Sequence, residues 1–420
     1  MTPIEFSELQ YGMFVHFGLF SMLGRGEWVM NREQIPPAVM REYASKFNPE
    51  CFDADAICSL AVEGGMKYIV FTTMHHDGFR LYDTALTDHN SVHYCGRDLV
   101  QEILDAARRH GLKTALYHSL NNWFDQPDAV AALESPGNYD IFIQNTFDRL
   151  TELVEKYRPI DILWYDGWWP FNADSWQAIK MNETLRKIQP GLLFNGRNGL
   201  AGDFGTPEQH LTAPKPWRPW EACVTLNQHW GYHAGDHRWK APEEVIQMLR
   251  TCAVSKGNLL LNIGPRGDGS VPEESCRIVR QVGQWLRRGG RESLTDIEPM
   301  PFSPMLPQPD DRGDWDASCR FSCSGNNLYC AVEFWPGSSW TLTGLNAQVS
   351  QVIACGEYDL KFTQEKGKIT IELPEILKQE TAPVLKLVCD RKPAIYRTGG
   401  MRVPECPHPR YDPVPPDIQY

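Results

Sequence analysis

Over about the first 290 of its 420 residues, this chain alternates between short apolar runs and amphipathic segments with helical periodicity. This alternation restricts the fold more than any other feature. The apolar runs contain few polar positions, which is typical of strands buried on both faces, and such strands separated by helices form parallel sheets. We predict strands at 13–20, 67–73, 113–120, 161–168, 192–199, 221–227 and 258–264, and helices at 53–65, 98–111, 138–158, 175–191, 242–257 and about 271–289.

Seven such strands are compatible with an eight-stranded barrel or with an open doubly wound sheet. No GxGxxG motif follows the first strand, which weakens the dinucleotide-binding form of the open sheet. Polar and aromatic residues gather at the carboxyl ends of the strands, as in HFG, MHHDGF, YHS, YDGWW and NGRN. In a barrel these ends meet at one rim, where active sites lie. We therefore predict an α/β fold with a (β/α)8-like barrel, in which the eighth strand or a helix is irregular.

The sequence pattern changes near residue 298. We assign residues 1–297 to the barrel and read the Pro-rich stretch 298–311 as a linker. Residues 312–392 show strand-type alternation with Gly and Asn turns, and EKGK has the form of a hairpin turn. This region is predicted to be a small antiparallel β-sandwich domain. The Pro-rich tail, 393–420, is expected to be extended or packed on the surface.

Composition excludes several classes of function. The formal net charge of −12 and the lack of a long basic run argue against nucleic-acid binding. No apolar stretch is long enough for a membrane span, and the N-terminus lacks the features of a signal peptide. None of the twelve cysteines forms a CxxC pair, so we read them as reduced thiols in a cytoplasmic protein and predict no metal and no cofactor. A homo-oligomer is compatible with the sequence but is not indicated by it.

Two adjacent histidines, His75 and His76, follow the second predicted strand. On a strand they would point to opposite faces, but in the loop after it both can face a ligand. Imidazoles hydrogen-bond hydroxyl groups well, so ligand binding and a structural role remain open for them. A metal site is the weakest reading, because the sequence contains no HxH or HExxH motif.

Near the N-terminus, His16 ends the first strand, and Glu27 directly precedes Trp28. A carboxylate beside an indole suits a sugar, since the carboxylate accepts hydrogen bonds from hydroxyls while the indole covers the C–H face. The alternative is a solvated loop glutamate next to a packing tryptophan.

Asp166 stands at the end of a predicted strand in the aromatic stretch LWYDGWWP. A carboxylate in such surroundings has a free-energy cost unless it has partners, which favours a functional role over capping of the next helix. Glu208, in the loop GDFGTPE, could reach over the barrel mouth, whereas Glu221 opens a strand and so starts at the opposite rim. Asp166 with one of these glutamates supplies the two carboxylates needed for glycoside hydrolysis.

Seven motifs occur in order over residues 11–269: MFVHFGLFS, GEWVM, HHDGFRLYDT, LWYDGWWP, GDFGTPE, WEACVTLNQHWGY and LLLNIGPRGDG. Together they closely resemble the retaining α-L-fucosidases of glycoside hydrolase family 29. The resemblance implies an exo-acting enzyme that removes terminal α-L-fucose from fucosylated glycans or small fucosides by double displacement. Asp166 would be the nucleophile and Glu208 the acid/base, with Glu221 as the second candidate, and the two carboxylates should lie about 5–5.5 Å apart.

The same resemblance implies a set of fucose-binding residues and one departure from the family pattern. Trp230 is the candidate wall for the C5 methyl group, and Arg197 is a fixed cation that can orient the carboxylates. Met74 stands where relatives often have a basic residue. Rival functions are α-L-galactosidase activity, a catalytically silent fucose-binding protein and, more weakly, a metal-dependent hydrolase. The implied binding residues are His16, Glu27, Trp28, His75, His76, Tyr117, Trp164 and Arg197.

Overall fold

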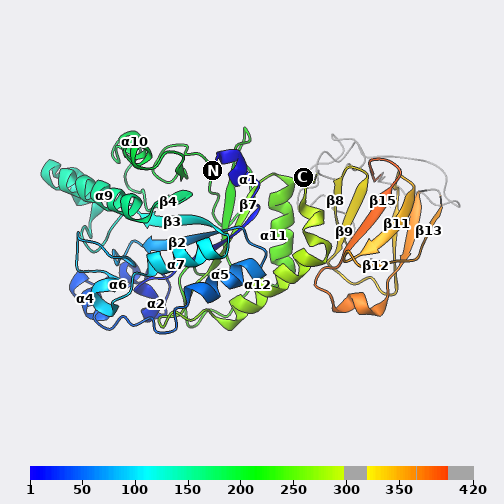
Figure 1. The fold of residues 1–420 in the computed structure, drawn as a ribbon, viewed down its shortest axis with the longest axis horizontal. Coiled ribbons are helices and arrows are strands. Elements are labelled where there is room, and N and C mark those ends of the chain that lie inside the picture. Colours follow the sequence, from blue (N-terminus) through cyan, green and yellow to red (C-terminus); the bar gives the residue numbers. More distant parts are fainter. Residues whose placement is uncertain (298–318, 366, 396–420) are drawn as a thin grey trace. The chain divides into compact units, whose positions relative to one another are not determined.

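The computed structural model describes residues 1–297, 319–365 and 367–395 of the chain (Figure 1). The chain divides into two compact units, Met1–Ala241 with Ser255–Arg280, and Pro242–Val254 with Gln281–Tyr420. The predicted linker and the tail from residue 396 onward lie outside the described residues. The domain boundaries therefore stay a prediction.

The first unit is built on a seven-stranded parallel sheet in the order β5-β4-β3-β2-β1-β7-β6. Nearly every strand residue is buried, as expected for strands covered on both faces. The parallel barrel-type sheet predicted from the alternation is confirmed. Its strands are β1 (Tyr11–Val15), β2 (Tyr68–Met74), β3 (Lys113–Ser119), β4 (Ile162–Asp166), β5 (Leu193–Phe194), β6 (Glu221–Thr225) and β7 (Asn258–Ile263).

An irregular segment, 204–208, connects the two edge strands of this sheet, and we call it the closing segment. It forms one isolated bridge to Asn195, directly after β5, and bridges from Gly205 to Trp220 and from Glu208 to Cys223 on the β6 side. These single bridges take the place of a continuous ladder. The sequence left open whether the eighth strand or a helix is irregular, and the closing segment corresponds to the first alternative.

Helices follow the strands and pack on the sheet; α5 and α7 lie beside β2, for example (Figure 1). Asp53 and Asp98 begin these two helices, and their side chains accept hydrogen bonds from backbone N–H groups of the first turn. The longer helices of the chain are α4 (Pro37–Ala44), α5 (Ala54–Glu63), α7 (Leu99–Arg109), α9 (Pro136–Tyr157), α10 (Ala178–Ile188), α11 (Pro242–Val254) and α12 (Glu273–Trp285), and the shorter ones are α1 (Pro3–Ser7), α2 (Phe20–Leu23), α3 (Val29–Arg32), α6 (Ser91–Cys95) and α8 (Ala129–Glu134).

Six of the seven strands end before the predicted residue, and the difference is largest for the first and the fifth. The first predicted strand ends at Val15, and beyond it the N–H of Phe17 donates to the side-chain hydroxyl of Thr72 in β2 at 3.0 Å, outside the backbone ladder. The fifth ends at Phe194, and its remaining residues form the loop that carries Arg197. Both corrections shorten a strand at its carboxyl end and lengthen the loops at that rim.

The second unit contains two antiparallel sheets, ordered β10-β14-β13 and β12-β11-β15-β9-β8. Their buried faces share one hydrophobic cluster that includes Leu328, Leu342, Ile369 and Leu387, and this confirms the predicted β-sandwich. The expected hairpin is present, with Glu365 paired to Lys368. The strands are β8 (Cys319–Ser324), β9 (Asn327–Val332), β10 (Ser339–Thr343), β11 (Val349–Ala354), β12 (Tyr358–Asp359), β13 (Phe362–Glu365), β14 (Lys368–Glu372) and β15 (Val384–Cys389). Among the described helices, none combines the length and the apolar character that crossing a bilayer would require.

Candidate active site

A cavity of about 160 Å³ lies at the carboxyl ends of the barrel strands. Every residue predicted for catalysis or fucose binding lines it, apart from the alternative acid/base Glu221. A larger and more open hollow of about 550 Å³, around Asp53 and Arg109, contains none of the predicted residues. The cavity is lined by Phe14, His16, Glu27, Trp28, His75, His76, Tyr117, Trp164, Asp166, Trp168, Trp169, Arg197, Glu208, Cys223 and Trp230.

Asp166 is the last residue of β4, and two neighbours stabilise its charge. The Tyr117 hydroxyl donates to Oδ2 at 2.8 Å, and Nη1 of Arg197 donates to Oδ1 at 3.0 Å. Burial alone would raise the pKa of Asp166, but the charge of Arg197 and the hydrogen bonds from Arg197 and Tyr117 hold the pKa below its ordinary value. The aromatic surroundings therefore contain an ionised carboxylate with one face free toward the cavity.

Arg197 connects the two predicted catalytic carboxylates. Its Nη1 contacts Asp166, and its Nη2 lies 2.8 Å from Oε2 of Glu208. The guanidinium stacks over the Trp164 ring at 4.7 Å and donates from Nε to the Thr206 hydroxyl at 3.1 Å. A planar, permanently charged fork held in this way fixes the relative position of both carboxylates.

Glu208 lies on the closing segment, in a more exposed position than Asp166. Its side chain is 42% exposed, against 16% for Asp166. The indole N–H of Trp230 donates to Oε1 of Glu208 at 3.2 Å. A carboxylate at the mouth can meet a leaving group and water, whereas the buried one meets only what enters the cavity.

Glu221 is fully buried at the first residue of β6 and does not line the cavity. The Tyr68 hydroxyl donates to one of its oxygens at 2.7 Å, and the indole N–H of Trp164 donates to the other at 2.6 Å. Burial raises the pKa of Glu221 to about 7, although both hydrogen bonds oppose the rise. Its oxygens are thus committed to barrel side chains at the end opposite the rim.

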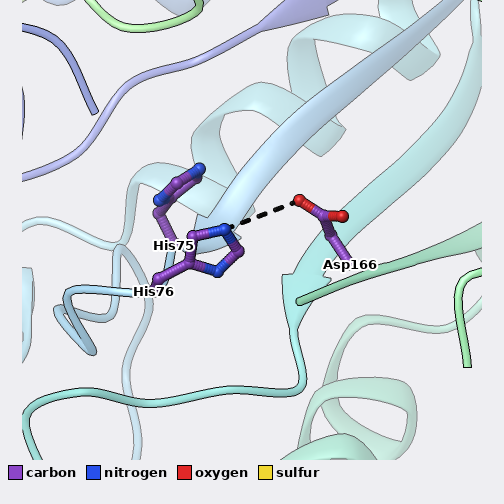
Figure 2. A group of neighbouring side chains, drawn as sticks. All are labelled: His75, His76 and Asp166. Atoms are coloured by element: carbon purple, nitrogen blue, oxygen red, sulfur yellow. Dashed lines mark ion pairs between the residues drawn. The ribbon is translucent and has the colours of Figure 1, made fainter. Parts of the chain in front are cut away.

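His75 and His76 directly follow the last residue of β2, and both line the cavity. Because the strand ends before them, both side chains can face a ligand. Together with Asp166 they offer ligand atoms within 4.8 Å of one another, which is the geometry of the metal alternative (Figure 2). A divalent cation there would have to share Asp166 with the guanidinium of Arg197, which repels it. The arrangement therefore favours an uncharged ligand.

Glu27 is held by a backbone N–H group, and Trp28 is held by aromatic rings. Glu27 is buried and accepts the N–H of Gly231 at 2.9 Å, so it fixes the loop that carries Trp230. Trp28 packs edge-on against His76, Trp123 and Trp169, and the last of these forms an exposed lip of the cavity.

A sequence model of the α-L-fucosidase family matches residues 1–291. The chain belongs to the α-L-fucosidase family. Rat plasma α-L-fucosidase is 30% identical over 69% of this chain and 69% of its own length, and human plasma α-L-fucosidase is 29% identical over 89% and 86%. The solved structure of α-L-fucosidase isoenzyme 1 from Paenibacillus thiaminolyticus is 31% identical, with a TM-score of 0.79, and covers 93% of this chain and 100% of that one. Members of this family, glycoside hydrolase family 29, hydrolyse glycosidic bonds.

Four lining residues, Phe14, Trp168, Trp169 and Cys223, were not assigned from sequence. Phe14 and Cys223 lie within buried strands, where residue type alone indicates core packing. Strand alternation could have identified Cys223, because it shares a face of β6 with Glu221 and points into the barrel. The two tryptophans stood in a motif already singled out, but nothing in the sequence told which way they face.

Proposed function

We propose that this α-L-fucosidase acts by a retaining double displacement in which Asp166 is the nucleophile and Glu208 the acid/base. The observation that carries the proposal is the guanidinium of Arg197, which contacts both carboxylates and leaves one buried and one at the mouth. Glu221 is then a structural residue of the barrel interior. The aromatic walls around the cavity suit a deoxy sugar, whose C5 methyl group packs against apolar surface.

In the first step an oxygen of Asp166 bonds to the anomeric carbon of fucose, and the bond to the leaving oxygen breaks. Glu208 gives its proton to that oxygen, so it must enter the cycle protonated while Asp166 is ionised. In the second step water attacks the same carbon, Glu208 takes its proton, and the ester to Asp166 breaks. Two inversions release fucose with its original α configuration.

Purified protein offered p-nitrophenyl α-L-fucoside should release nitrophenol, and EDTA should leave the rate unchanged. Proton NMR of the first-formed sugar should show the α anomer. No release would contradict the fucosidase assignment, a β product would contradict retention, and loss of activity with EDTA would restore the metal alternative.

The leaving group has a candidate site beside the cavity. An open groove of about 410 Å³ shares Trp168, Arg197 and Glu208 with the cavity and extends to His210 and Arg218. Because the acid/base protonates the leaving oxygen, the aglycone has to lie on the Glu208 side, and the exposed face of Trp168 offers a stacking surface for a sugar ring. We propose that this groove receives the sugar to which fucose is linked.

A substitution of His210 tests the groove, because His210 lines the groove but not the cavity. His210→Ala should lower kcat/KM several-fold for fucosyl disaccharides and leave hydrolysis of α-L-fucosyl fluoride unchanged, because fluoride is a leaving group without a sugar ring. An equal loss on both substrates, or no loss on a panel of differently linked disaccharides, would place the aglycone elsewhere.

Two alternatives remain for direct comparison. α-L-Galactosidase activity would need a polar contact for the extra hydroxyl at C6, whereas Phe14 and Trp230 form an aromatic corner with ring centroids 5.8 Å apart. A silent fucose-binding protein would not need a paired nucleophile and acid. Assays with the matching galactoside, and with the variants described below, separate these readings.

A further inference from the structure

The active-site histidines are held by neighbours that determine which ring nitrogen carries the proton. Nδ1 of His76 lies 2.6 Å from the hydroxyl of Ser119, and that hydroxyl lies 2.7 Å from the carbonyl oxygen of Asn121. A carbonyl oxygen can only accept, so the single hydroxyl proton of Ser119 points to Asn121. The hydroxyl oxygen must therefore accept a hydrogen bond from His76, and the proton lies on Nδ1.

An independent chain of contacts leads to the same result for His16. Its Nδ1 lies 2.7 Å from Oδ1 of Asn262, and the amide nitrogen of Asn262 donates to the carbonyl oxygen of Trp230 at 2.7 Å. The carbonyl of Trp230 fixes which end of the amide is the donor. Asn262 therefore presents an acceptor to His16, which must donate from Nδ1.

Both rings are neutral near neutral pH. Burial lowers the pKa of His16 to about 3 and that of His76 to about 4. A neutral imidazole with its proton on Nδ1 has a lone pair on Nε2. For His76 this nitrogen lies 3.7 Å from Oδ2 of Asp166 and faces the same space (Figure 2).

We propose that Ser119 and Asn262 are positioning residues that keep His76 and His16 in the Nδ1–H tautomer, so that both present an unprotonated Nε2 to the sugar. This inference rests on the proposed function and extends it to substrate recognition. The two nitrogens accept hydrogen bonds from sugar hydroxyls. The same tautomer keeps the His76 proton away from Asp166; the opposite tautomer would direct an N–H at the nucleophile and reduce its reactivity.

The packing around Ser119 is consistent with a fixed hydrogen bond. Gly167, directly after Asp166, has a φ of +66°, and a Cβ there would lie 2.8 Å from the Ser119 hydroxyl oxygen and 3.0 Å from Nδ1 of His76. Only glycine leaves room for this contact without strain. The residue that follows the nucleophile therefore packs against the hydrogen bond that fixes the histidine.

Histidine-labelled protein examined by ¹⁵N NMR reports the tautomer directly, and His76→Gln assigns the signal. The wild-type spectrum should show His76 protonated on Nδ1, and Ser119→Ala should shift His76 toward the Nε2–H form. The kcat/KM for p-nitrophenyl α-L-fucoside should fall roughly 10- to 100-fold, by analogy with the loss when the hydrogen-bond partner of a metal-binding histidine is removed. Ser119→Thr, which keeps a hydroxyl, should restore the tautomer and part of the activity.

Thr73 provides a matched control. Its hydroxyl donates to the carbonyl of Tyr117 and accepts from Nδ1 of His118 by the same logic, but neither Thr73 nor His118 lines the cavity. Thr73→Val should change the His118 signal and leave kcat/KM near the wild-type value.

The proposal is overturned if wild-type His76 carries its proton on Nε2, or if Ser119→Ala changes the tautomer without changing kcat/KM. The tautomer of His76 in the wild type and in Ser119→Ala is measured by NMR and does not require catalytic activity. An inactive wild-type protein would therefore contradict the fucosidase assignment and not the tautomer assignment.

Discussion

At the scale of single residues, the site depends on a cation that joins two carboxylates of unequal burial. Asp166 is ionised because the charge of Arg197 and the hydrogen bonds from Arg197 and Tyr117 outweigh the cost of burial. Glu208 lies at the mouth on the same guanidinium, while Glu221 has both oxygens bound by Tyr68 and Trp164. Residue type alone could not separate the two glutamates, and their different partners support the proposal that Glu208 is the acid/base.

Asp166→Gly should lower kcat by at least roughly 1,000-fold, since it removes the atom that bonds to the sugar. Azide should restore part of the activity by entering the space of the missing carboxylate. The measurement is nitrophenol release with increasing azide, and proton NMR should identify a fucosyl azide of inverted configuration. A near-wild-type kcat in the Asp166→Gly variant would contradict the nucleophile assignment.

Glu208→Ala should lose roughly 100- to 10,000-fold on fucosides with poor leaving groups and much less on aryl fucosides that need little protonation. Glu221→Gln serves as the comparison, because it changes a buried structural contact. The measurement is the hydrolysis rate of each variant on a series of fucosides whose leaving groups differ in acidity. If the dependence on leaving group steepens in Glu221→Gln and not in Glu208→Ala, the acid/base assignment is reversed.

At the scale of elements, the closing segment places Glu208. The segment is attached through isolated bridges, and the chain enters it through Gly202, whose φ is +70°. A Cβ on Gly202 would lie 2.4 Å from the carbonyl carbon of Asn195 and 2.6 Å from the nitrogen of Gly196. Backbone atoms at these distances cannot move aside without displacing the loop that carries Arg197.

Gly202→Ala should therefore lower both the free energy of unfolding and kcat/KM. Gly111→Ala is a matched control, because Gly111 also has a φ of +70° but has no atom within 4 Å of an added Cβ. Backbone strain should lower the free energy of unfolding of the control by about 1 kcal/mol, and its kcat/KM should be unchanged. Urea denaturation and steady-state kinetics of both variants measure the difference, and equal losses would remove the steric argument.

At the scale of the whole molecule, stability should depend on pH through the buried Glu221. Its pKa is raised from 4.5 to about 7 in the folded state, so the folded form binds the proton more tightly than the unfolded chain. The resulting stabilisation is complete below about pH 4.5 and is lost as pH rises through about 7. The full change is at most roughly 3 kcal/mol.

Comparison of wild type with Glu221→Gln isolates this effect, since glutamine does not titrate. The difference in free energy of unfolding between wild type and variant should fall as pH rises from about 4.5 to 7. Chemical denaturation of both proteins at several pH values measures this difference. A difference that is flat or that rises over this interval would show that Glu221 stays ionised in the folded protein.

The strand and helix order and the rim at which function lies could be predicted from local periodicity and from the fact that carboxyl ends of parallel strands meet at one edge. The resemblance to glycoside hydrolase family 29 added the binding residues Tyr117, Trp164, Arg197 and Trp230, and four other lining residues were not assigned from the sequence. The sequence left open the choice between Glu208 and Glu221 and the facing of the tryptophans. The cytoplasmic location stays a prediction.

Which side chains become partners depends on the three-dimensional fold. Arg197 meets Asp166 across 31 positions of sequence, and Trp164 meets Glu221 across 57. Such pairings depend on where irregular loops return to the barrel, and the closing segment has no periodicity from which its path could be read. Burial, ionisation and tautomer are properties of those pairings, so the sequence can name the chemical groups but the fold determines their state.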